Sequence, residues 1–271
     1  MTWSRETVDK PGWTRAIAAL ARGDRTLLAL WGQPGEVRMA THGAAGEIAV
    51  LQLPCPGGAF PSVAARHPPA MRLERALSDL TGLTAEGAPD ARPWLDHGRW
   101  PVRHPLGAAG PAARPAPYAF LSAEGDSLHQ IPVGPVHAGI IEPGHFRFTA
   151  SGETVVRLEE RLGYVHRGVE RLAVGADLAA AGKIAGRVSG DSTVAYAIGL
   201  ARAVEDALET EAPPRAQWLR ALMAELERLA NHLGDIEPPA TTPPSPSCTP
   251  TAGFCASKCC ARPPALSATA C

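Results

Sequence analysis

The chain has 271 residues, of which 45% are hydrophobic and 20% charged, and its formal net charge is −1. This composition suits a globular protein of one large or two modest domains, and the near-neutral charge argues against a nucleic-acid-binding protein. No apolar run approaches the roughly 18 to 20 residues that span a bilayer, and the first residues lack the apolar core of a signal peptide, so we expect a cytoplasmic protein.

The first hundred residues contain short periodic segments that predict a compact α+β domain. Apolar residues at helical spacing predict helices over 12–22 and 71–80, and the first of these places Trp13, Ile17 and Leu20 on one face. Alternating segments bounded by glycine and proline predict three short strands. Their ranges are 26–31, 36–40 and 47–53.

Residues 107–117, GAAGPAARPAP, indicate a Gly/Ala/Pro linker and a domain boundary. Beyond it, two alternating segments around Ser151-Gly152 predict a β-hairpin. Four helices follow, with expected ranges of 168–172, 176–181, 192–208 and 214–233. The last has an apolar stripe at helical spacing and is expected to face a core; the stripe comprises Trp218, Leu222, Leu226, Leu229 and Leu233.

Two histidines flank a loop in the segment GPVHAGIIEPGHFRF, residues 134–148. Imidazoles such as those of His137 and His145 can accept protons, donate to a carbonyl oxygen or bind a metal. Histidines in Gly/Pro-rich loops are also common as structural residues. The loop itself leaves both interpretations open.

A second polar cluster lies in GRVSGDSTVAYA, residues 186–197. Arg187, Ser189, Asp191 and Ser192 could hydrogen-bond a small polar ligand or take part in proton transfer. Alternatively, Asp191 and Arg187 form a buried ion pair with no catalytic task. Both interpretations remain open from the residues alone.

These two segments, together with LGYVHRGVERL at 162–172, resemble the large subunit of membrane-bound nickel-iron hydrogenases and the related quinone-site subunit of respiratory complex I. The segment 74–106 resembles the end of the complex I subunit that precedes the quinone-site subunit. The residues that keep its outline are Glu74, Arg75, Asp79, Gly82, Gly87, Pro89, Asp90, Arg92, His104, Pro105 and Leu106.

The resemblance implies an α+β fold in which a small α/β N-terminal domain precedes a β-hairpin and a mainly helical, incomplete, hydrogenase large-subunit-like domain. The corresponding ranges are 1–106 for the first domain, 107–130 for the linker and 131–236 for the second domain. It further implies that His137 and His145 line the ancestral cavity, where a histidine of the hairpin loop faces a quinone in the complex I branch. Together with Arg187 and Asp191 of the polar cluster, they are the candidate catalytic residues.

The resemblance fails at the metal ligands. A working hydrogenase carries a Cys-x-x-Cys pair in the third segment, where this chain has Ser189 and Ser192. Nickel and iron in such a centre require thiolates, and hydroxyls stay protonated at neutral pH and bind soft metals weakly. Tyr196 stands where the hydrogenase pattern usually has histidine. We therefore expect no metal site and no nickel-iron centre in this chain.

By resemblance, the chain is expected to act as an oxidoreductase subunit beside an iron-sulfur small subunit and membrane-arm subunits. Quinone and NAD(H) would be used by the whole complex, and the iron-sulfur clusters would belong to the partner. The chain would lie on the inner face of the cell membrane through these partners. A non-catalytic scaffold and an inactive truncated fragment are the alternatives.

The last 35 residues, 237–271, break the helical pattern and hold five of the six cysteines. A reading frame shifted by one base can encode a helical continuation that resembles the family, so a frameshift product is our preferred explanation. A natural disordered tail and a small metal or disulfide module are the other two. Adjacent Cys259 and Cys260, and the absence of a Cys-x-x-Cys pair, argue against the module.

Overall fold

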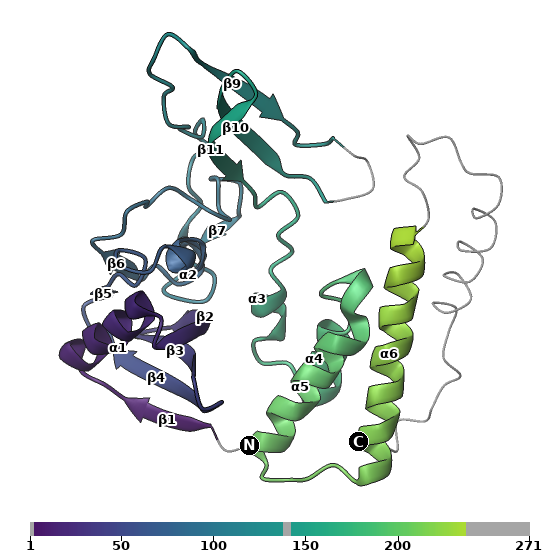
Figure 1. Cartoon of the computed structure of the whole chain (residues 1–271). Coiled ribbons are helices and arrows are strands. Elements are labelled where there is room, and N and C mark those ends of the chain that lie inside the picture. Colours follow the sequence, from purple (N-terminus) through teal and green to yellow (C-terminus); the bar gives the residue numbers. More distant parts are fainter. Residues whose placement is uncertain (1–2, 138–141, 237–271) are drawn as a thin grey trace, which may run out of the picture. The chain divides into compact units, whose positions relative to one another are not determined.

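The computed structural model describes residues 3–137 and 142–236 (Figure 1). The chain forms two compact units, Met1–Arg167 and Gly168–Cys271, each of which is described separately below. Helices and strands are mixed, which confirms the predicted α+β class. The boundary between these two units, at Arg167 and Gly168, differs from the boundaries of the sequence-based domains 1–106 and 131–236. Those domain boundaries stay a prediction. The tail explanations lie outside the described residues.

The first unit contains a four-stranded sheet of order β1-β4-β3-β2. Strands β2 to β4 are antiparallel neighbours and confirm the three predicted strands, whereas β1 runs parallel to β4 and was not predicted. The sequence of β1, SRET, is polar and exposed throughout, so it carries no strand signal. The bounds are β1 Ser4–Thr7, β2 Arg25–Gln33, β3 Glu36–Gly43 and β4 Ile48–Pro54.

Helices α1 (Lys10–Arg22) and α2 (Met71–Thr81) both pack against β2 and confirm the two predicted helices. The side chain of Asp9 caps α1 by accepting from the N–H of Gly12 at 2.7 Å. Trp13 is fully buried, and its indole N–H donates to the carbonyl of Pro61 at 3.1 Å. This packing forms the apolar core of the unit. The remaining short elements here are β5 Ala59–Pro61, 3-10 helix η1 Pro68–Ala70 and β6 Thr84–Glu86.

A second sheet of order β11-β10-β9 belongs to the same unit. The predicted hairpin is confirmed as β10 (His145–Ser151) and β11 (Thr154–Arg161), and the sequence missed β9 (Leu128–Val133). Gly152 in the hairpin turn has a φ of 57°, a left-handed conformation that suits glycine. The predicted linker also contains β8 (Gly110–Pro111), which pairs with β7 (Val102–Arg103).

The second unit is helical, and its four predicted helices are confirmed. The bounds are α3 Val169–Ala173, α4 Leu178–Ala185, 3-10 helix η2 Gly190–Ser192, α5 Thr193–Ala207 and α6 Pro214–Ile236. No residue of α3, α4 or α5 is buried. None of the described helices is both long and apolar enough to cross a membrane.

The apolar stripe of α6 does not face a core among the described residues, so that prediction is wrong for this structure. Trp218 and Leu222 are 77% and 56% exposed, and Leu226 and Leu229 are about half exposed. The physical reason is that, among the described elements, α6 packs substantially against α5 and η2 alone. Neither of these covers the stripe.

Candidate functional site

His137 and His145 lie on the two sides of the loop that joins β9 to β10. The Nδ1 atom of His145 lies 3.3 Å from the carbonyl oxygen of Gly134, and its ring packs 5.2 Å from that of Phe120. His137 is exposed, and its ring lies 5.7 Å from that of Phe146. The two histidines therefore share one loop, as predicted from the sequence, and each contacts an aromatic ring.

A pocket of about 460 Å³ opens beside His145. We call it the Arg147 pocket; its lining residues are Arg99, Pro115, Ala116, Pro117, Tyr118, Phe120, His145, Arg147, Arg161 and Tyr164. Three of these side chains are guanidinium groups, and none of the described residues that line it is acidic. The sequence-based reasoning missed its arginines.

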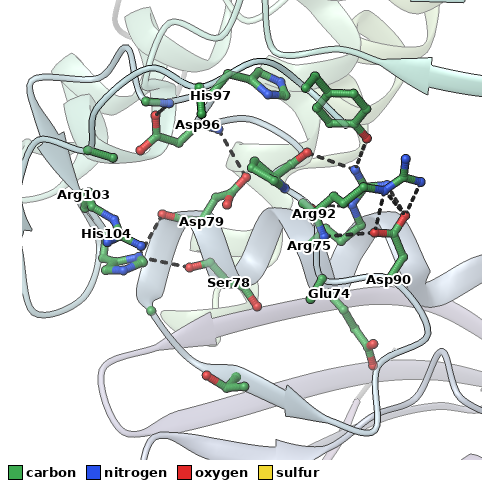
Figure 2. A pocket seen from close by; sticks show the side chains of 18 of the residues that line it. Glu74, Arg75, Ser78, Asp79, Asp90, Arg92, Asp96, His97, Arg103 and His104 are labelled. Carbon is green, nitrogen blue, oxygen red and sulfur yellow. Dashed lines mark hydrogen bonds and ion pairs between the residues drawn. The ribbon is translucent and has the colours of Figure 1, made fainter. Parts of the chain in front are cut away.

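A larger cavity of about 550 Å³ lies beside α2, and Figure 2 shows the side chains that line it. We call it the α2 cavity. It gathers many of the residues that gave segment 74–106 its resemblance to the complex I subunit. These are Glu74, Arg75, Asp79, Gly82, Asp90, Arg92 and His104. A pattern spread over some thirty positions in sequence thus converges on one place.

Arg75 and Asp90 form the centre of this cavity. The buried guanidinium of Arg75 pairs with the Asp90 carboxylate at 3.2 Å and donates to Tyr118 Oη at 2.8 Å. Burial alone would raise the pKa of Asp90, but hydrogen bonds from Arg92 and the charges of Arg75 and Arg92 outweigh it and lower that pKa. Asp90 is therefore an anion held by two cations.

Arg92 extends the network to the second sheet. It donates to Asp90 at 2.7 Å and to Glu159 of β11 at 2.8 Å. The hydrogen bond to Asp90, opposed by burial, raises the pKa of Arg92. Glu159 also accepts from the backbone N–H of Leu121 at 3.2 Å. These contacts fasten the segment around residues 90–121 to both α2 and the sheet.

Glu74 and Asp79 of α2 are carboxylates whose hydrogen bonds bind different segments, Glu74 the residues 62–64 and Asp79 the residues 94–96. Burial raises the pKa of Glu74, which accepts from the Ser62 hydroxyl at 2.8 Å and in Figure 2 points away from Arg75 and Asp90. Asp79 accepts from three consecutive backbone N–H groups, of Trp94, Leu95 and Asp96, at 2.7 to 3.2 Å. Because these polar atoms bind one another, the α2 cavity is best explained as a structural network.

The predicted cluster of Arg187, Ser189, Asp191 and Ser192 lies in the second unit, where η2 leads into α5. Arg187 and Asp191 are both exposed and no ion pair joins them, so the buried ion pair considered from the sequence is wrong. The backbone carbonyl of Asp191 accepts from Asn231 of α6 at 2.8 Å. The four residues remain neighbours on one short connection.

Ser192 borders an apolar hollow of about 570 Å³ within the second unit. Its other lining residues are Val169, Glu170, Ala173, Ala181, Ile184, Ala185, Val188, Ala195, Tyr196, Gly199 and Leu200. The hollow thus joins Ser192 to a mostly aliphatic surface. The histidine loop belongs to the first unit, so the six predicted site residues are divided between the two units.

In the described part of the second unit, residues 168–236, the positions expected from the family pattern to carry thiolates are occupied by serines. Ser189 and Ser192 offer hydroxyls, which are poor ligands for soft metals. Within residues 3–137 and 142–236, no group of three His, Cys, Asp or Glu side chains could hold a metal ion. The described part of the chain contains Cys55, which lies in the core of the first unit, where burial raises the pKa of its thiol.

Two segments of the chain match models of known protein families. Residues 37–115 match the 30 kDa subunit of respiratory-chain NADH dehydrogenase, and residues 167–234 match nickel-dependent hydrogenase. The chain is thus similar to each family over one segment. This confirms the resemblance inferred from the sequence motifs, and the first match contains the α2 cavity residues from 74 to 104. The histidine loop lies between the two matched segments.

Individual relatives are similar to more than half of this chain. Hydrogenase-4 component G of Escherichia coli K12 is 39% identical over 186 residues, which cover 64% of this chain and 33% of that protein. Formate hydrogenlyase subunit 5 of the same organism is 37% identical over 187 residues, or 64% and 32% of the two chains. The C/D subunit of the NADH-quinone oxidoreductase of Bdellovibrio bacteriovorus is 30% identical over 172 residues, or 59% and 30%. The matched region therefore spans about a third of the length of these relatives.

Proposed function

We propose that the chain is part of a subunit of a membrane-associated complex of the hydrogenase or NADH-quinone oxidoreductase kind. In this complex it couples electron transfer from an iron-sulfur partner to a quinone or to proton chemistry. The observation that carries the proposal is that one chain holds the 30 kDa segment followed by the nickel-dependent hydrogenase segment. The relatives are named as hydrogenase, formate hydrogenlyase and NADH-quinone oxidoreductase components.

The proposed subunit has no nickel-iron centre of its own. The support is the donor chemistry at Ser189 and Ser192, where hydroxyls replace the thiolates that the family pattern requires. The electrons would then come from iron-sulfur clusters of a partner. Quinone and NAD(H) belong to the proposed complex as a whole, and the chain would be peripheral on the inner face of the cell membrane.

Within this function, His145 and Asp191 are the proposed proton-handling groups, with His137 and Arg187 beside them. Imidazole is the side chain that exchanges protons near neutral pH, and carboxylates also serve in general acid–base catalysis. His145 is partly buried with its Nε2 atom unpartnered, and Asp191 is exposed on the connection into α5. Nε2 of His145 therefore takes part in no structural hydrogen bond.

The test is to express the tagged full-length chain together with the neighbouring genes of its own locus. We expect an iron-sulfur protein to co-purify, quinone reduction by the complex, and nickel well below one atom per chain. Asp191→Asn and His145→Ala should each lower quinone reduction by ~10-fold or more. His129→Gln, an exposed histidine on β9, is the matched control. Stoichiometric nickel with hydrogen turnover, or the lack of any iron-sulfur partner, would contradict the proposal.

A scaffold without catalysis is the second candidate, and the second unit favours it. No residue of α3, α4 or α5 is buried, and apolar side chains such as Trp218 and Leu222 are exposed, as expected of surfaces that other polypeptide covers. Full quinone reduction in an intact complex that carries both Asp191→Asn and His145→Ala would favour the scaffold over the coupling role.

A further inference from the structure

The Arg147 pocket concentrates positive charge on one face of the second sheet. His145 and Arg161 are direct partners in the register of β10 and β11. Arg147 follows His145 by two positions, so its side chain emerges on the same face of the strand. Arg99, which is exposed, adds a third guanidinium to the lining. The backbone ladder therefore brings Arg147 and Arg161 together, and Arg99 joins them from outside the sheet.

Aromatic rings, rather than carboxylates, hold two of these guanidinium groups. The Cζ atom of Arg147 lies 4.0 Å from the centroid of the Phe120 ring, and that of Arg161 lies 4.7 Å from the centroid of the Tyr164 ring. Arg161 also donates to the hydroxyl of Tyr164. Contacts with ring faces orient a guanidinium group while they leave most of its N–H groups available to a ligand.

Two buried nitrogen atoms at the pocket lack a hydrogen-bond partner. These are Nε of Arg147 and Nε2 of His145. Buried polar atoms are nearly always bonded, so such a pair calls for an explanation such as a ligand or an ordered water. Because Nδ1 of His145 faces the carbonyl oxygen of Gly134, Nδ1 carries the hydrogen of the neutral ring, and Nε2 is left to accept from a ligand hydroxyl.

The acidic residues of β11 do not neutralise the pocket. Glu159, which lies opposite Arg147 in the register, is bonded to Arg92 at 2.8 Å and lies 3.5 Å from Arg157 Nε. Glu160 emerges on the other face of the strand and pairs with Arg72 at 3.3 Å. The positive charge of the pocket is thus available to an anionic ligand.

We propose that the Arg147 pocket binds a phosphate group, with Arg147 and Arg161 on its anionic oxygens and His145 on its hydroxyl. Arginine binds phosphate through charge-assisted hydrogen bonds, often two at a time, and a hydrogen phosphate group offers both the anionic oxygens and the O–H that this lining requires. A volume of about 460 Å³ accommodates inorganic phosphate or the phosphate of a small ester. The site shares His145 with the proposed electron-transfer function, but the arginines that carry it, Arg147 and Arg161, take no part in that function.

The test is calorimetric titration of the full-length chain with sodium phosphate at constant ionic strength, with sodium chloride as the reference. We expect saturable binding of one phosphate per chain, weakened about tenfold or more by Arg147→Gln and by Arg161→Gln. Arg66→Gln, which removes an exposed arginine outside the pocket, should leave the affinity unchanged. Thermal unfolding of each variant verifies that it folds.

Further titrants distinguish the sources of the ligand. If glycerol phosphate binds as tightly as inorganic phosphate or more tightly, the natural ligand is a phosphate ester. If inorganic phosphate binds and glycerol phosphate does not, the ligand is the free ion. Both results support the site. The proposal is overturned if phosphate gives no more heat than chloride, or if Arg66→Gln weakens binding as much as Arg147→Gln. It is also overturned if a glutamate-rich peptide binds and phosphate does not, because the pocket would then receive acidic side chains. If Arg147→Gln fails to fold, the phosphate and chloride titrations of the unaltered chain decide.

Discussion

Glu227 of α6 accepts a hydrogen bond from the backbone N–H of Val194 at 2.6 Å, so a carboxylate from one helix caps the first turn of another. Its second oxygen accepts from the N–H of Ala195 at 3.1 Å. The residue in the N-cap position, Ser192, makes no side-chain cap bond of its own. Together with the bond from Asn231 to the Asp191 carbonyl, this contact ties α6 to the connection that carries the predicted site residues.

We expect Glu227→Ala to lower the stability of α5 by about 1 kcal/mol, because it removes both a cap and a negative charge at a helix N-terminus. Amide hydrogen exchange over residues 193–197 measures the effect. Glu225→Ala is the control, since that carboxylate makes an exposed pair with Arg228 at 3.2 Å and should change exchange by less than about 0.5 kcal/mol. Equal effects of the two substitutions would contradict the cap.

Arg75→Met should lower the free energy of unfolding of the first unit by about 3 to 5 kcal/mol. The substitution leaves the Asp90 carboxylate without one of its two cations and removes the donor to Tyr118. Urea unfolding measures the change. Arg72→Met, on the same helix, removes an arginine with a 63% exposed side chain and should cost about 1 kcal/mol or less. A small loss for Arg75→Met would show that the network contributes little.

The stability of the first unit should depend on pH through His97. Burial, reinforced by the charge of Arg161, lowers the pKa of His97, and its Nε2–H donates to the carbonyl of Leu162 at 2.9 Å. The folded protein therefore binds this proton less readily than the unfolded chain, so stability falls as the pH drops below the ordinary histidine value of 6.5 towards the lowered one. Unfolding in urea at a series of pH values measures this slope.

His97→Gln keeps a side-chain N–H for Leu162 and removes the titration, so it should flatten the slope in that range. His129→Gln, at an exposed position on β9, should leave the slope unchanged. Asp90 acts in a separate window, because its pKa is lowered from 3.8 and its contribution is lost only as the pH falls through that lower value. A slope that survives His97→Gln would assign the dependence to another group.

Gly163→Ala should destabilise the first unit by about 2 kcal/mol or more. Gly163 has a φ of 87°, and a Cβ atom there would lie 2.6 Å from the carbonyl oxygen of Leu95, so strain and a backbone clash combine. Gly152→Ala is the matched control, because its φ of 57° is strained but nothing lies within 4 Å of the added atom. It should cost about 1 kcal/mol. Chemical unfolding midpoints compare the two.

Much of the fold could be predicted because local signals and tertiary structure agree. The buried face of α1 follows from the spacing of Trp13, Ile17 and Leu20, whereas its first residues, Lys10 and Pro11, lay outside the predicted range 12–22. In contrast, β1 is a polar edge strand that depends on its parallel pairing with β4, which no local pattern encodes. The exposure of the α6 stripe likewise depends on what surrounds the helix.

Prediction of the candidate sites from the sequence was limited in the same way, because their residues come together only in the folded chain. The spacing around His137 and His145 located their loop, but the neighbouring arginines come from segments up to 62 positions apart, from Arg99 to Arg161. The alternation of His145 and Arg147 on one strand was a usable signal that the sequence-based reasoning missed. The facing position of Arg161 required the hairpin register, in which the ladder shifts between Thr149 and Ala150. The partners of Arg75 and Asp90 likewise required the folded path of residues 88–121.

The distribution of buried side chains determines where proteases in a cell can attack the chain. Every described side chain that is buried belongs to the first unit, from Trp13 to Glu159, and α3, α4 and α5 contribute none. Segments with few buried contacts open locally at low energy, long before the rest of a protein unfolds. Proteases should therefore cleave the isolated chain first within residues 168–236 and leave the first unit as a resistant fragment, so the helical half would set the lifetime of any unassembled copy.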